Sequence, residues 1–325
     1  VVLCDVDVTN NQAAQGTNDD VGGAIYTSSS GRNTGNVYIV NSNITNNQAE
    51  SNGGGLYMAG TNVGESILYL KDSSISGNTA ASAGGNLDDR RGGGFYITDD
   101  GNKIVFENVT VSDNLTNGRH RNDGGGGAFA GADHTIEVNG GSFVRNKTGQ
   151  DTNGSDSDGG GFWSATTRSN FTFTETQIGG ALDGSGQAVN GNISEDDGGG
   201  FYLEGRTNTY DFVDVKIEGN VSYDSGGGFM VANDTETVNI IQTGTGNSYI
   251  KDNYSVTEHG GGFRNDGIVN INTTDSKGAA SVGVFEISGN QARQGATQMK
   301  ADGTGQGGGD RVGGGFYVTS NSETN

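Results

Sequence analysis

A glycine-rich signature that recurs nine times constrains the fold of this chain more than any other feature. Each copy has two or three glycines, and the residues that follow them are mostly apolar and often aromatic. Repeats of this kind, which bury a face only against their neighbours, are typical of solenoids. The copies read GGAIY from Gly22, GGGLY from Gly53, GGGFY from Gly92, GGGAF from Gly125, GGGFW from Gly159, GGGFY from Gly198, GGGFM from Gly226, GGGFR from Gly260 and GGGFY from Gly313.

An apolar residue followed three positions later by Asn precedes every copy. Stacked asparagines at a turn can each bond the next amide, so we expect a ladder that stabilises the fold. Its members would be Asn11, Asn47, Asn78, Asn114, Asn146, Asn192, Asn220, Asn253 and Asn290, after Val8, Ile44, Ile75, Val111, Phe143, Val189, Ile217, Ile250 and Ile287.

Apolar pairs at strand spacing lie upstream of several of these motifs, as at Val37 with Ile39 and at Leu68 with Leu70. Residues two apart lie on one face of a strand, and no stretch has helical periodicity. The sequence therefore predicts an all-β protein, a right-handed single-stranded parallel β-helix of about nine coils. We expect residues 1–325 to form one domain, either a segment of a longer chain or a filament subunit.

Composition excludes several classes of function. Only 30% of residues are hydrophobic, 61 are Gly and none is Pro, so a compact core of ordinary size is not expected. The formal charge of -21 opposes binding to nucleic acid or to an anionic membrane. No apolar run is long enough to span a membrane. The single Cys4 allows no intrachain disulfide.

The position after the apolar residue of the glycine signature is mostly aromatic. If the apolar residue points inward, this one points outward. An outward aromatic stripe would suit sugar rings or a neighbouring rod, although loops of the chain itself would serve equally well as its cover. The stripe comprises Tyr26, Tyr57, Tyr96, Phe129, Trp163, Tyr202 and Tyr317.

The loops between the Asn and the glycines are acidic. Clustered carboxylates suit Ca²⁺, although no EF-hand loop or calcium-binding nonapeptide is present, and a solvated acidic edge is the alternative. The sequence predicts no cofactor, and Ca²⁺ is the one ion that these loops would suit. Its candidate ligands are Asp19, Asp20, Asp123, Asp158, Asp196 and Asp197.

Eleven Asn-x-Ser/Thr sequons indicate a glycoprotein. Sequons whose Asn faces inward cannot be modified, so those outside the ladder are the better candidates. The latter are Asn43, Asn108, Asn153, Asn170, Asn233 and Asn272, and the sequons within the ladder are Asn114, Asn146, Asn192, Asn220 and Asn253.

Catalytic patterns are weak. The three histidines fall in different coils, and no Ser-His-Asp or zinc spacing is recognisable. Acidic dipeptides such as Asp196-Asp197 would point to opposite faces of a strand, although two coils could supply one carboxylate each. We therefore expect that the protein has no enzymatic activity.

GGAI at Gly22–Ile25 and FVRN at Phe143–Asn146 resemble the GGA[ILV] and FxxN repeats of the chlamydial polymorphic outer membrane proteins. The wider set of extracellular right-handed parallel β-helix repeat proteins is similar too. This resemblance implies an extracellular or cell-surface location and a role in adhesion and display.

The sequence thus predicts a non-enzymatic structural or adhesive surface protein. Neither end carries a recognisable cap, so we expect head-to-tail stacking into a filament or, otherwise, contacts with surface glycans or host proteins. The alternatives are a carbohydrate-binding module that uses the aromatic stripe and, less favoured, a polysaccharide lyase or hydrolase.

Overall fold

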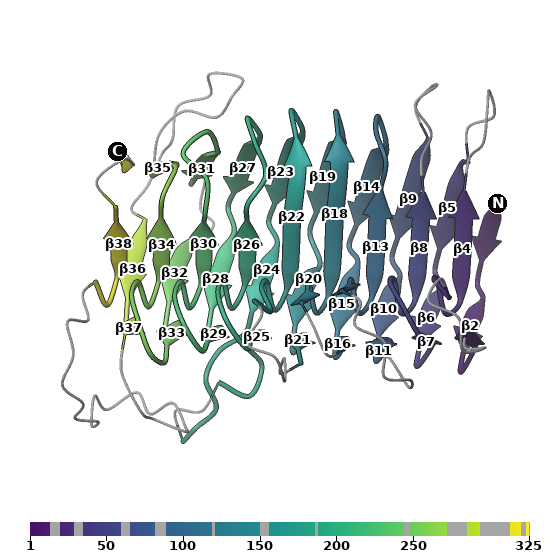
Figure 1. The fold of residues 1–325 in the computed structure, drawn as a ribbon, viewed down its shortest axis with the longest axis horizontal. Helices are drawn as coiled ribbons and strands as arrows, with labels where there is room; N and C mark the ends of the chain where they lie inside the picture. The colour runs from purple at the N-terminus through teal and green to yellow at the C-terminus, as the bar shows by residue number, and fades with distance from the viewer. Residues whose placement is uncertain are drawn as a thin grey trace.

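The computed structural model describes residues 1–13, 20–28, 35–59, 66–81, 89–118, 121–149, 156–185, 188–243, 248–271, 285–292, 313–319 and 323–324. These residues form a right-handed parallel β-helix whose axis runs horizontally in Figure 1. In the described residues, nine coils each contribute one strand to each of four sheets, named A to D in the order in which the chain visits them, and β39 adds a tenth strand to sheet A. The predicted fold class is confirmed.

Sheet A begins each coil and lies behind sheet D in Figure 1. In its strand β9, Leu68 and Leu70 are buried in the core while Tyr69 faces outward, as alternation along a strand requires. Sheet A contains β1 (Val2–Cys4), β5 (Val37–Val40), β9 (Ile67–Lys71), β14 (Lys103–Glu107), β19 (Thr135–Asn139), β23 (Asn170–Thr174), β27 (Thr209–Val213), β31 (Thr237–Ile241), β35 (Ile268–Ile271) and β39 (Glu323–Thr324).

Sheets B and C are made of shorter strands that close the lower side of the coil in Figure 1. Sheet B contains β2 (Asp7–Thr9), β6 (Asn43–Thr45), β10 (Ser74–Ser76), β15 (Thr110–Ser112), β20 (Ser142–Val144), β24 (Gln177–Gly179), β28 (Lys216–Glu218), β32 (Tyr249–Lys251) and β36 (Glu286–Ser288). Sheet C contains β3 (Gln12–Ala13), β7 (Gln48–Ala49), β11 (Thr79–Ala81), β16 (Leu115–Asn117), β21 (Lys147–Thr148), β25 (Ile193–Ser194), β29 (Val221–Ser222), β33 (Tyr254–Ser255) and β37 (Gln291–Ala292).

Sheet D follows the glycine signature and faces the viewer in Figure 1. It contains β4 (Ile25–Ser28), β8 (Leu56–Ala59), β13 (Phe95–Thr98), β18 (Gly127–Ala132), β22 (Phe162–Thr167), β26 (Phe201–Leu203), β30 (Phe229–Val231), β34 (Phe263–Asn265) and β38 (Phe316–Val318). Before the glycines of two coils, β12 (Arg90–Arg91) and β17 (Asn122–Asp123) form a further two-stranded sheet.

The parallel pairing stacks each coil on the next. Sheets B, C and D each have nine strands among the described residues, and the first and last strand of each sheet pair on one side only. Seven inner coils are therefore paired on both sides. At the usual strand spacing of about 4.8 Å, each coil lengthens the rod by that amount.

The core is a single column of apolar side chains inside the coil. Sheets A, B and D all contribute to it, since the Phe95 ring of sheet D packs edge-on against Phe106 of sheet A and Phe143 of sheet B. Toward the C-terminus the rings stack in parallel instead, with centroids 4.6 Å apart between Phe201 and Phe229. Such stacks need few apolar residues per coil, which explains how a chain of low hydrophobicity folds.

Sharp corners account for the glycine signature. Gly92 begins its corner with φ of +67°, a conformation that glycine adopts without steric cost. A Cβ on Gly93 would lie 2.3 Å from the Gly125 carbonyl oxygen of the next coil, so no larger side chain fits there. Other corners use Asn or Asp in the same left-handed region, as at Asn41 and Asp72.

Candidate functional site

The asparagine ladder runs through all nine coils. In each step the Nδ2 atom donates to Oδ1 of the next Asn at 2.9 to 3.0 Å, and that oxygen also accepts the backbone N–H of the first Asn. The seven Asn from Asn47 to Asn253 are at most 1% exposed. The predicted ladder is thus a continuous buried chain of hydrogen bonds.

One apolar position before the ladder was predicted wrongly. Val189 is half exposed, at 51%, and lies outside the core. Its place in sheet B is taken by Ile178, which pairs with Phe143 and Ile217. An insertion after Gly179 separates Ile178 from Asn192, so in this coil the buried apolar residue and the ladder Asn are not three positions apart.

The aromatic stripe also differs from the prediction. Sheet D aligns Tyr96 with Ala128 and then Trp163, whereas Phe129 aligns with Ile97 and is buried in the core. The shift arises because the first glycine of this copy is Gly124, which has φ of +66°. Phe129 therefore does not belong to the stripe.

The middle of the stripe is covered. Trp163 is only 2% exposed, and the guanidinium carbons of Arg91 and Arg121 lie 5.0 and 6.0 Å from the centroid of its ring. Tyr26 at the first coil remains 56% exposed and stacks on Tyr57 with centroids 5.6 Å apart. The remaining members have Tyr96 buried and Tyr202 and Tyr317 half-buried. An open stripe along the whole rod is therefore wrong.

The sequons separate by exposure. Each of the five within the ladder uses both its amide hydrogens in buried bonds, as Asn146 does with Val111 O and Asn192 Oδ1. Outside the ladder, Asn43, Asn108 and Asn170 are exposed and Asn233 is half-buried. Asn153 and Asn272 lie outside the described residues, and so does Asp19 of the proposed Ca²⁺ ligands.

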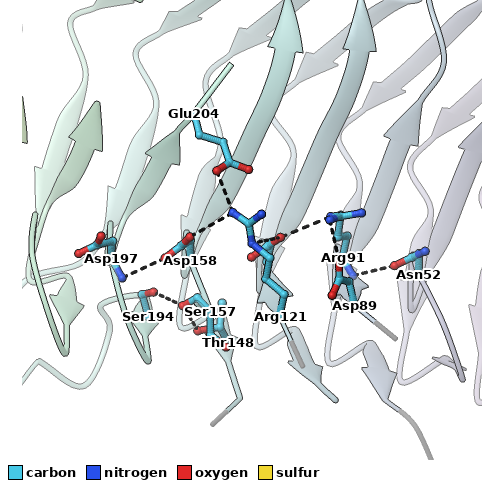
Figure 2. Close-up of polar contacts among 11 residues, drawn as sticks. Asn52, Asp89, Arg91, Arg121, Thr148, Ser157, Asp158, Ser194, Asp197 and Glu204 are labelled. Atoms are coloured by element: carbon cyan, nitrogen blue, oxygen red, sulfur yellow. Dashed lines mark hydrogen bonds and ion pairs between the residues drawn. The ribbon is translucent and has the colours of Figure 1, made fainter. Parts of the chain in front are cut away.

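The residue that precedes the first glycine of each signature defines a second column, here called the pre-glycine column. In the described residues, the N–H of each first glycine from Gly22 to Gly226 donates to the carbonyl of the pre-glycine residue in the next coil, which keeps the column in register. Its described polar members are Asn52, Arg91, Asp123, Asp158, Asp197, Ser225 and His259. Figure 2 shows its central part, where Asp123 and Asp158 are buried.

Asp123 is held by arginines. It is fully buried, and its Oδ2 lies 3.3 Å from Arg91 Nε and 3.4 Å from Arg121 Nε. Burial raises the pKa of Asp123, while the two guanidinium groups oppose that rise. Arg121 also reaches Glu204 at 2.8 Å and Asp158 at 3.6 Å (Figure 2). Asp123 is therefore neutralised by the chain itself and is a poor Ca²⁺ ligand.

Three other carboxylates come together beside it. Asp158, Asp196 and Asp197 each offer an oxygen within 4.8 Å of the others. Burial first, and then the neighbouring carboxylates, raise the pKa of Asp158 and of Asp197, and the pKa of Asp196 rises to about 7. Asp20 lies in the first coil, remote in the stacking order, with its carbonyl bonded to Ser51 N.

The expectation that adjacent aspartates would point apart does not hold for Asp196 and Asp197. They lie in the bend that leads into the glycines and not in a strand, so both carboxylates reach Asp158 of the preceding coil. Strand alternation applies only to extended backbone.

A third column of polar residues was not found from the sequence. It lies at the corner before sheet A, where Asn102 N–H donates to His134 Nδ1, His134 N–H to Ser169 Oγ, Ser169 N–H to Asn208 Oδ1 and Asn208 N–H to Glu236 Oε2. These residue types differ from coil to coil, so no repeat signal marks them. Burial raises the pKa of Glu236 to about 7 and lowers that of His134.

No known protein family, curated protein or solved structure was found that matches this chain. Among the described residues there is also no helix of the length and apolarity needed to cross a membrane. The function must therefore be inferred from the fold and from the contacts described above.

Proposed function

We propose that this protein is a non-enzymatic extracellular rod with a structural or adhesive role. The observation that carries the proposal is the ladder from Asn11 to Asn290, which stiffens every coil with the same hydrogen bonds and is buried from Asn47 to Asn253. A rod of this kind holds its lateral surface in a fixed geometry, and that surface is the part that can make contacts.

The burial of the acidic groups favours this role over catalysis. Asp123 and Asp158 are at most 1% exposed, and the Arg121 guanidinium lies beside both. A carboxyl group that acts on a glycosidic bond must reach the substrate. Incubation with acidic and neutral polysaccharides should therefore release no reducing or unsaturated ends. Release of such ends that is lost in Asp197→Asn would overturn the proposal and favour a hydrolase or lyase.

The carbohydrate-binding alternative rests on two stacked rings at the N-terminal end of the stripe, the exposed Tyr26 and the half-buried Tyr57 of the next coil. Immobilised glycans provide the test. A structural rod binds none of them, whereas binding that Tyr26→Ala abolishes, with Tyr96→Ala as the buried control, would assign the protein to sugar recognition.

Assembly into filaments is the finer part of the proposal. Parallel strands at the end of a stack have free backbone groups on one side, and another copy of the coil is their natural partner. Negative-stain electron microscopy should show fibres of uniform width. Isolated rods of about 40 Å, from about nine coils at strand spacing, would rule out stacking and leave an adhesive rod.

The exposed sequons support an extracellular location. Asn43, Asn108 and Asn170 lie at corners of the coil where an attached glycan would extend into solvent. The net charge of -21 suits a rod that remains soluble outside the cell. Surface labelling of intact source cells with an antibody to the chain tests this location, and signal only after permeabilisation would contradict it.

A further inference from the structure

Two adjacent coils place three carboxylates around one point. Asp158 precedes Gly159, Asp196 and Asp197 precede Gly198, and one oxygen from each lies within 4.8 Å of the other two. The N–H of Asp197 donates to Asp158 Oδ1 at 3.2 Å, which fixes the two residues side by side (Figure 2). One carboxylate of the cluster is thus held by a backbone N–H of the next coil.

Asp158, a member of this cluster, has one buried carboxylate oxygen without a hydrogen bond from the described residues. The residue is 1% exposed, and its Oδ2 accepts no hydrogen bond from the described residues. Its nearest cation, Arg121 Nη2, lies at 3.6 Å and is already bonded to Glu204 at 2.8 Å. The Ser157 hydroxyl next to it is 2% exposed and also has no hydrogen-bond partner among the described residues. Buried oxygens in this state cost free energy unless a ligand satisfies them.

The arginines of the region do not balance these charges. Arg91 pairs with Asp89 and Asp123, and Arg121 with Asp123 and Glu204. On the other side, Arg264 pairs with Asp266 and partly offsets the charge of Asp197. Asp224, Asp156 and Glu258 add further negative charge beside Asp196. The three clustered carboxylates therefore require a cation or protons.

We propose that Asp158, Asp196 and Asp197 bind one divalent cation of the Ca²⁺ class. Ca²⁺ takes six to eight oxygen ligands, and three carboxylates supply enough negative charge for binding at the concentrations found outside cells. The cation ties the bend before Gly159 to the bend before Gly198. This cation site goes beyond the proposed structural role, because it makes the stiffness of the rod depend on a bound ion.

Terbium luminescence and thermal unfolding of the full chain test the site at pH 8. Tb³⁺ is a luminescent substitute for Ca²⁺, and Tyr202, which follows Asp197 by five residues in the same coil, is the aromatic residue expected to excite it. We expect saturable Tb³⁺ emission that Ca²⁺ displaces, and a melting temperature that rises with Ca²⁺ and falls on adding EDTA.

Variants locate the effect. Asp196→Asn and Asp197→Asn should each weaken Tb³⁺ binding by about tenfold or more. Asp113→Asn is the matched control, because Asp113 is an exposed acid paired with Arg145, and should leave binding unchanged. No saturable emission, or equal affinity in all variants, would overturn the proposal. So would a melting temperature that rises on acidification and does not respond to Ca²⁺ at pH 8, because protons would then satisfy the cluster.

Discussion

The Nδ2 atom of Asn146 donates to Oδ1 of Asn192 at 3.0 Å, although 46 residues separate the two asparagines. The same oxygen accepts the backbone N–H of Asn146 at 3.0 Å. The insertion after Gly179 leaves the coil and returns before Asn192, so the ladder continues as if the insertion were absent. The coil is therefore a rigid frame on which loops of different length are carried.

Removing a central amide should cost far more than removing a terminal one. Asn146→Ala removes the buried acceptor of Asn114 N–H and of one Asn114 Nδ2 hydrogen, and the buried donor to Val111 O, so we expect a loss of about 3 to 5 kcal/mol in the free energy of unfolding. Asn11→Ala, at the exposed first coil, should cost about 1 kcal/mol. Urea denaturation of both variants measures the difference, and equal losses would contradict a cooperative ladder.

At Gly127, a ring from the neighbouring coil occupies the space that a side chain would need. A Cβ there would lie 2.1 Å from the Phe95 ring, which is enclosed by Phe106, Phe129 and Phe143. We expect Gly127→Ala to destabilise the protein by about 1 to 3 kcal/mol because the ring cannot move freely. Adding Phe95→Leu to Gly127→Ala should recover part of this loss. A double mutant that loses the sum of both single effects would show that the two residues are not coupled.

Glu236 should make stability fall as the pH rises. Its pKa is about 7 in the folded protein, above the ordinary value of 4.5, because of burial. The free-energy cost of burying the ionised Glu236 is absent below the pKa of the unfolded chain. This cost grows between pH 4.5 and 7 and reaches about 3 kcal/mol. Glu236→Gln mimics the protonated form, so its stability should exceed that of the wild type at pH 8 and match it near pH 4. Denaturation curves at both pH values provide the comparison, and an unchanged pH profile in the variant would refute this origin.

Glycan occupancy should follow exposure. When the chain is secreted from a eukaryotic host, we expect glycans at Asn43, Asn108 and Asn170 and none at Asn146 or Asn192. A glycan on a ladder Asn removes an amide hydrogen that the folded protein uses, so chains modified there should not fold. Glycopeptide mass spectrometry of the secreted protein measures occupancy, and modified Asn146 in folded material would contradict the expectation.

The sequence determined the features that repeat from coil to coil. Alternating pairs such as Val37 with Ile39, and an Asn at one fixed corner, predicted the strands and the ladder. These features are local and identical in each coil, so stacking repeats the same contact and the pattern can be read without the structure. The ladder position likewise predicted which sequons are buried.

Only the tertiary structure decided which contacts are made by the residues that differ from coil to coil. A shift of one residue at Gly124 places Ala128 and not Phe129 in the aromatic stripe. The arginines that cover Trp163 come from other coils, and Arg91 reaches Asp123 from the neighbouring coil. Likewise, Asp158 meets Asp197 across 39 residues because backbone pairing brings two bends into register. Which of the non-repeating side chains meet depends on strand register and on loop length. Both relate residues that are far apart in the sequence, so local sequence patterns do not reveal these contacts.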